Sequence, residues 1–285
     1  MKIYRRFILA ALLAACWSNA LFAYNPLNRA EYLAKIKEAE ALYKEKCRTV
    51  AGIRIYKTVA DVEGLLLMKI RPERTDRDLA NPMWPGAAFG GEVYGDSYIQ
   101  SFLGYEYRAV DKHGVVSSVR GYINSEQRPG GLPGYRWVEV VDPKDGQRYR
   151  YTGSTKVVGK KDATAYNVQL ELKKNPSYDM NVYRWSLDKT PSPSNNPPRY
   201  GVTFEDHVIP EERALWVASS TVKVLDLTTN EVLGEMTRYA MSYIHAPRHS
   251  MPWLNHSICP EMNVTGYLDS TRKFVDEILI PKKER

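Results

Sequence analysis

The sequence contains few cysteines, with three among 285 residues, and only six phenylalanines against twenty tyrosines. So few cysteines exclude a disulfide-rich scaffold. No apolar run approaches the roughly 20 residues that a membrane-spanning helix needs, so we expect the body of the protein to be soluble. The sequence also lacks a phosphate-binding glycine loop, a metalloprotease helix and a paired-carboxylate site. These absences exclude the commonest enzyme signatures.

The charge balance is mildly basic, with a formal net charge of +7. Lys2, Arg5 and Arg6 are the charged residues among the first fifteen, so the remaining chain carries about +4, with both signs mixed along it. Such a balance does not favour nucleic-acid binding. We expect neither a nucleic-acid partner nor a cofactor.

The first sixteen residues have the form of a bacterial targeting segment. The basic start is followed by an apolar run from Phe7 to Ala15, which is too short to cross a bilayer and is typical of a secretory signal peptide. The run ends in Leu13-Ala14-Ala15-Cys16, which resembles the lipobox of bacterial lipoproteins. The resemblance implies cleavage before Cys16 and attachment of lipid, including palmitate, to this cysteine.

On this interpretation residues 1–15 are the signal peptide and residues 16–27 a lipidated tether. Trp17 stands where an aspartate would favour retention in the inner membrane, so the resemblance implies a protein anchored in the outer membrane that faces the periplasm. An alternative is ordinary secretion. Cleavage after Ala20 or Ala23 would remove Cys16 with the leader.

The two remaining cysteines, Cys47 and Cys259, lie near opposite ends of the mature chain. In an oxidising envelope compartment an isolated pair is usually a disulfide. Closing a loop of this length stabilises a fold by about 4–5 kcal/mol in loop-entropy models. The alternative is two separate buried thiols.

Periodicity predicts an α+β fold, a mainly antiparallel β-sheet with an N-terminal helix and a short C-terminal helix packed on it. Helical spacing favours helices over residues 29–47 and 269–280. Alternating or buried apolar runs predict strands over residues 53–58, 64–70 and 163–172, and hairpins over 135–151 and 218–243. In the first hairpin, Tyr149 and Tyr151 share one face and Arg148 and Arg150 the other. This opposite face is either an anion-binding surface or a solvated one.

Two segments show no periodicity. Residues 73–92 form a long predicted loop in which Trp84 is either a ligand-facing ring or a plug over the core. Residues 190–198 contain four prolines and predict an exposed, extended linker. This linker separates a helix and β-rich region at 28–189 from a hairpin and helix at 199–285, which belongs to the same domain or forms a subdomain.

The stretch Val93-Tyr94-Gly95-Asp96-Ser97-Tyr98 resembles the first block of the GDSL (SGNH) hydrolases. The resemblance implies Ser97 as a nucleophile whose amide helps to form an oxyanion hole. The family also uses an Asp-x-x-His to supply a base, and no histidine of this chain has an aspartate three residues before it. A serine without an orienting base is a weak nucleophile, so the alternative is a Gly-Asp-Ser turn before a strand.

His245, His249, His256 and Cys259 lie within fifteen residues and have the chemistry to hold zinc or copper if the cysteine is reduced. Their spacing matches no familiar zinc motif, and a disulfide at Cys259 would remove the thiolate, which favours an ordinary loop without metal. His207 follows two acidic residues, which suits a general base or a structural histidine.

The lipobox, the capped helix that ends in Cys47, the strand at 62–68 and the Trp137 hairpin together resemble a group of uncharacterised proteobacterial envelope lipoproteins. The resemblance implies an immunity-type protein that guards against toxins delivered by type VI secretion. We therefore expect a membrane-tethered, non-enzymatic periplasmic binding protein with a toxin or an envelope component as its partner. The alternatives are a serine esterase using Ser97 and a structural subunit of an envelope complex.

Overall fold

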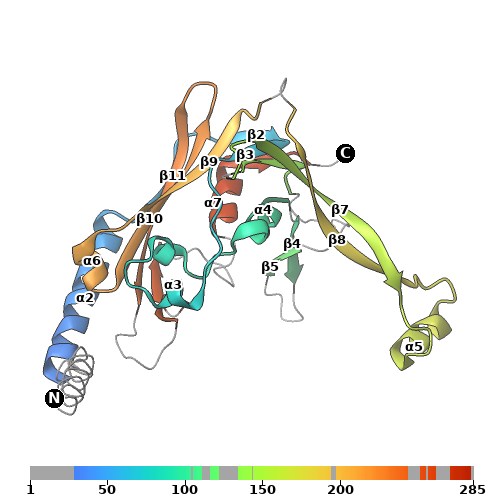
Figure 1. Ribbon diagram of the computed structural model, residues 1–285, viewed down its shortest axis with the longest axis horizontal. Helices are drawn as coiled ribbons and strands as arrows, with labels where there is room; N and C mark the ends of the chain where they lie inside the picture. The colour runs from blue at the N-terminus through green and yellow to red at the C-terminus, as the bar shows by residue number, and fades with distance from the viewer. Residues whose placement is uncertain are drawn as a thin grey trace, which may run out of the picture.

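The computed structural model describes residues 29–103, 105–110, 116–121, 134–142, 144–193, 197–242, 251–254, 256–260 and 270–283. Figure 1 shows an arch with two arms that descend from a shared top. One arm carries the long strands β10 (Val217–Asp226) and β11 (Glu231–Ser242), and the other is the hairpin of β7 (Arg148–Lys160) and β8 (Asn181–Pro191). Helix α4 (Gly95–Leu103) lies on the concave side between them.

One large sheet forms the frame of the arch. Its strands follow the order β1-β11-β10-β9-β3-β6-β7-β8, and β12 pairs with the same side of β11 as β1 does. Most pairs are antiparallel, whereas β3 runs parallel to both β6 and β9. The fold is therefore α+β with a mixed, mainly antiparallel sheet. The strands not yet placed are β1 (Gly52–Ile55), β3 (Gly64–Leu67), β6 (Trp137–Val141), β9 (Tyr200–His207) and β12 (His256–Cys259).

Two small sheets complete the strands described. Strand β2 (Val59–Val62) pairs in parallel with β13 (Leu279–Pro281), and β4 (Tyr105–Val110) pairs with β5 (Val116–Gly121).

Both predicted hairpins are confirmed. Strands β10 and β11 pair from Val217↔Met241 to Asp226↔Glu231, and Asn230 supplies the left-handed turn conformation with φ 59°. Strands β6 and β7 pair as expected, but β7 continues well beyond the predicted hairpin to Lys160. The extra length forms the second arm of the arch.

The predicted terminal helices are also confirmed. Helix α2 (Arg29–Thr49) packs on β10 and β11, where Ala39 meets Tyr239 and Met241 in a small apolar cluster. Helix α7 (Ser270–Ile278) buries Phe274 and Val275 against the main core.

The predicted disulfide between Cys47 and Cys259 is present, with Cα atoms 5.7 Å apart across a sequence separation of 212 residues. Cys259 ends β12 opposite Tyr239, and β1 begins at Gly52 opposite Thr237, two residues earlier on β11. The end of α2 therefore comes beside the end of β12, and the disulfide joins these two elements.

The strand predicted at residues 163–172 is wrong. This segment forms helix α5 (Tyr166–Lys174) at the end of the β7–β8 hairpin. Its alternation of apolar residues resembles a strand, but at the end of a projecting hairpin it has no neighbouring strand to pair with in the described chain. Leu, Gln, Glu and Lys are good helix formers, so local propensity decides the outcome.

The predicted loop at 73–92 contains two short helices, α3 (Asp76–Ala80) and η1 (Pro85–Phe89). Thr75 and Asp78 form a capping box that starts α3. This helix start is visible in the sequence, but apolar periodicity does not indicate it. Trp84 packs against the core, which agrees with the plug interpretation. Two further short helices are α6 (Pro210–Ala214) and η2 (Pro252–Leu254).

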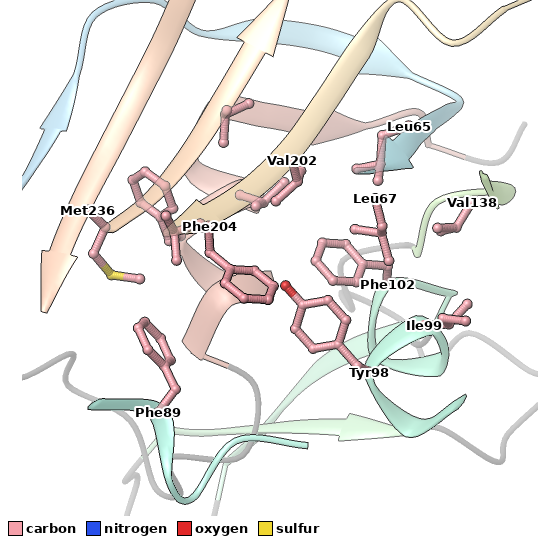
Figure 2. Close-up of a cluster of buried hydrophobic side chains, with 14 of the residues drawn as sticks. Leu65, Leu67, Phe89, Tyr98, Ile99, Phe102, Val138, Val202, Phe204 and Met236 are labelled. Atoms are coloured by element: carbon pink, nitrogen blue, oxygen red, sulfur yellow. The ribbon is translucent and has the colours of Figure 1, made fainter. Parts of the chain in front are cut away.

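The core lies between the concave side of the sheet and the helices beneath it (Figure 2). Leu65 and Leu67 of β3 and Val202 of β9 face Tyr98 and Phe102 of α4. One face of the predicted β6–β7 hairpin is apolar as expected, since Tyr149 and Tyr151 pack on this core. The opposite face of these strands is where the candidate site lies.

Candidate functional site

Ser97 does not lie in a hydrolase-like setting. It is exposed in the first turn of α4, and its amide donates to the carbonyl of Tyr94 at 3.1 Å. The block therefore opens a helix, and the strand expected after it in the alternative interpretation is wrong. His207 lies on β9, 3.1 Å from the hydroxyl of Thr221. Among the described residues Ser97 has no histidine hydrogen-bonded to its hydroxyl.

The predicted metal ligands are only partly described. His245 and His249 lie outside the described residues, as do Cys16 and the rest of residues 1–28. His256 lies on β12, where burial and the positive charge of Arg238 lower the pKa of its imidazole to about 4. Cys259 is bonded to Cys47 and offers no thiolate. Within the described ranges no three His, Cys, Asp or Glu side chains are grouped to hold a metal ion.

Among the described helices, none is both long and apolar enough to cross a membrane.

A buried ionic cluster lies in the core. Arg71 is sandwiched between the rings of Phe89 and Phe204, at 4.2 and 3.7 Å, and pairs with Asp206 at 2.7 Å. Glu92 accepts hydrogen bonds from the amide and hydroxyl of Thr271, and burial raises the pKa of this carboxyl. Arg71 and Glu92 are nearly inaccessible to solvent, so the cluster anchors the start of α7 and is closed to ligands.

The outer face of β6 and β7 holds a second buried carboxylate. Glu139 is fully buried between Arg148, at 2.7 Å, and Arg150, at 2.8 Å. The guanidinium of Arg150 also stacks on the indole of Trp137 at 4.0 Å. The two arginines are therefore neither a free anion site nor a solvated face, because they neutralise a carboxylate of their own sheet.

The proline-rich segment covers this face. Strands β8 and β9 are separated in the sheet by β7, β6 and β3, so the chain that joins them has to cross those three strands. Arg148 donates to the hydroxyl of Ser192 at 3.0 Å and to the carbonyl of Pro193 at 3.4 Å. Pro198 is buried rather than exposed. The segment expected to be an exposed linker is thus packed in part against one continuous sheet.

A pocket of about 300 Å³ opens between this segment and the turn from β2 to β3. Its apolar walls are Trp137, Pro197, Pro198 and Tyr200. A β-carbon at Gly64 would come within 2.2 Å of the Trp137 ring. Only glycine at residue 64 lets the indole lie against β3, so these two residues shape the pocket together.

The charges at the pocket are paired with one exception. Glu63 accepts from Lys282 at 2.5 Å, and this contact lowers the pKa of its carboxyl. Arg199 pairs with Asp226 at 2.9 Å. Asp61 is exposed, adopts a left-handed φ of 58°, and has no hydrogen bond or ion pair with the described chain.

The residues that line this pocket are suited to binding a ligand or a side chain of a partner. Aromatic and proline rings bury apolar or cationic groups, and an unpaired carboxylate at the rim favours a positive charge. A strained backbone at such a rim is a feature of ligand sites. Sequence reasoning missed the pocket because the linker, β2 and Trp137 are far apart along the chain; the glycine that opens the 64–70 run was the available signal.

No protein-family model matches the chain, and comparisons with curated proteins and with solved structures find no significant match. The case for function therefore depends on the residues of this chain.

Proposed function

We propose that this chain is a non-enzymatic binding protein, tethered by lipid at Cys16 and facing the periplasm from the outer membrane. In its more specific form, the protein neutralises a secreted toxin, as an immunity protein does. The disulfide between Cys47 and Cys259 supports an oxidising compartment, since such bonds rarely persist in a reducing cytoplasm.

The observation that carries the proposal is the pocket beside Trp137. Its walls are rings, its other charges are internally paired, and Asp61 remains available at the rim. A side chain that combines an apolar stem with a cationic head suits both features. We infer that the partner inserts a lysine or arginine side chain there.

The test expresses each secreted protein encoded beside this gene, as a candidate toxin, in the periplasm, with and without this protein. The expected result is survival and a stable complex with the unaltered protein. Asp61→Asn keeps the size of the side chain and its tolerance of positive φ but removes the charge, so it should weaken the complex about tenfold or more. Asp76→Asn changes another exposed aspartate, on α3 and outside the pocket lining, and should leave binding unchanged.

Failure to protect, together with failure to form a complex, would overturn the immunity proposal. If the protein instead co-purifies in fixed ratio with components of an envelope machine, the structural-subunit alternative is favoured.

A further inference from the structure

The β7–β8 hairpin extends far beyond the body of the protein (Figure 1). Strand β6 pairs with β7 only over Arg148–Tyr151, whereas the β7–β8 ladder continues to Lys160↔Asn181. The distal part is therefore a two-stranded ribbon with no third strand in the described chain. At about 3.3 Å per residue, the stretch from Thr152 to Lys160 reaches roughly 30 Å.

The end of this hairpin exposes apolar side chains that contact no core. We call the following six residues the arm tip: Val157, Val158, Tyr166, Leu170, Val182 and Tyr183. The side chain of Tyr166 is 78% exposed, the highest value among the exposed large apolar residues of the described chain. A group of exposed apolar residues at one place marks an interaction surface.

Helix α5 carries two of the six arm-tip residues on one face. Tyr166 and Leu170 are one turn apart, and Lys173 and Lys174 continue the same face by another turn. Val168 is the buried residue of the helix and lies between Tyr166 and Leu170 in the sequence. The outward face of α5 therefore carries two apolar side chains followed by two lysines.

Basic side chains surround the arm tip: Lys156, Lys160, Lys161, Lys173, Lys174 and Arg184. Acidic partners neutralise only two of them, Lys156 by Asp188 at 2.8 Å and Lys174 by Glu171 at 2.9 Å. Lys160 and Lys161 donate to uncharged oxygens of an amide and a backbone carbonyl. The acidic residues of the same stretch, residues 156–188, are Asp162, Glu171, Asp179 and Asp188, so the stretch carries a formal net charge of +2.

We propose that the arm tip binds the anionic headgroup surface of a lipid bilayer. Tyr166 and Leu170 enter the interface, and Lys173 and Lys174 contact the headgroups. The composition favours a membrane over a protein partner, because protein interfaces are enriched in arginine and depleted in lysine, whereas the basic residues around the arm tip are five lysines and one arginine. Tyrosine and lysine, each with an apolar body and a polar end, suit the membrane interface.

The position of the arm supports this partner, in an argument that rests on the proposed function. Figure 1 shows the N-terminal end of α2 and the helix α5 at the same open side of the arch, in a view down the shortest axis. The described end of α2, which follows the proposed anchor residue Cys16 in the sequence, is therefore on the side to which the arm tip points. Once the anchor is inserted, binding of the tip is an intramolecular event, so a weak contact suffices.

The experiment removes the lipid anchor to isolate the tip. The full chain carrying Cys16→Ser and Leu170→Cys is labelled at residue 170 with an environment-sensitive dye, since Cys47 and Cys259 are held in a disulfide. The control carries the label at Tyr56→Cys, an exposed tyrosine beside β1, at the opposite end of the sheet order. Vesicles contain phosphatidylglycerol with phosphatidylcholine, or phosphatidylcholine alone.

The expected result is a blue shift of the dye at residue 170 with anionic vesicles, reversed by high salt, and none at residue 56. Lys173→Gln with Lys174→Gln should lower partitioning roughly 20- to 30-fold, because each lysine near an anionic surface contributes about a fivefold factor. Lys144→Gln, in the exposed β6–β7 turn, is the matched control.

No shift at residue 170, or equal shifts at both residues, would overturn the proposal. Crosslinking in cells from a photoreactive group at residue 170 to a protein, in place of lipid, would do the same and assign the tip to a protein partner. Because this variant has no lipid anchor, failure of vesicle binding is distinct from failure of lipidation at Cys16.

Discussion

The indole of Trp137 lies against Gly64, with the ring 2.2 Å from the place where a β-carbon would be. The two residues are directly paired in parallel strands β3 and β6. Their contact forms part of the pocket wall, and it requires that residue 64 has no β-carbon.

Gly64→Ala should therefore displace the Trp137 ring and destabilise the fold by about 1–3 kcal/mol, as overpacking does. Denaturant unfolding followed by tryptophan fluorescence measures both effects. Gly52→Ala is the matched control, since a β-carbon at Gly52 meets nothing within 4 Å. Equal stability of the two variants would contradict the account of this contact.

Removing the disulfide should cost stability without changing the fold. Cys47→Ser with Cys259→Ser is expected to lower the free energy of unfolding by about 2–5 kcal/mol, because the bond closes a loop of 212 residues. Urea unfolding with and without reductant measures the change. Reductant should destabilise the unaltered protein and have no effect on the double variant; an equal effect on both would exclude a structural disulfide.

The buried imidazole of His256 should make the protein sensitive to mild acid. Burial and Arg238 lower its pKa from 6.5 to about 4, so between these values the unfolded chain binds a proton that the folded protein does not. Stability should fall as the pH drops through this window, by up to about 3 kcal/mol. Unfolding curves of the unaltered protein and of His256→Asn measure the slope, and identical slopes would refute this explanation.

Ser97→Ala tests the enzyme alternative. Because the hydroxyl is exposed and has no base bonded to it among the described residues, any turnover of p-nitrophenyl esters by the purified protein should be the same in the variant. Loss of turnover in Ser97→Ala, with unchanged stability, would restore the esterase hypothesis.

Much of the fold could be predicted from local pattern. The hairpin that contains Val217 to Ser242 alternates along its length around a strong turn, and α2 has helical spacing with a basic end. The pairing of Cys47 with Cys259 followed from cysteine parity once Cys16 was assigned to lipid. In these elements the local signals and the tertiary contacts agree.

Other features were not accessible because they depend on distant parts of the chain. Helix α5 carries an alternation that also suits a strand, and its helix propensity prevails because no strand of the described chain lies beside it. The pocket brings Pro197 and Pro198 to Trp137 because β8 and β9 are separated by three strands in the sheet, which follows from strand order and not from composition. The burial of Glu139 likewise depends on arginines and a covering segment that no local pattern identifies.

The central claim is that this protein acts while held at a membrane surface through Cys16. Metabolic labelling with radioactive palmitate, followed by purification and membrane fractionation, tests this claim most directly. The account predicts label on the unaltered protein in a membrane fraction that resists high salt. In Cys16→Ser it predicts loss of the label and release of the protein from the membrane fraction by high salt. Label that persists in Cys16→Ser, or that never appears on the unaltered protein, would contradict it.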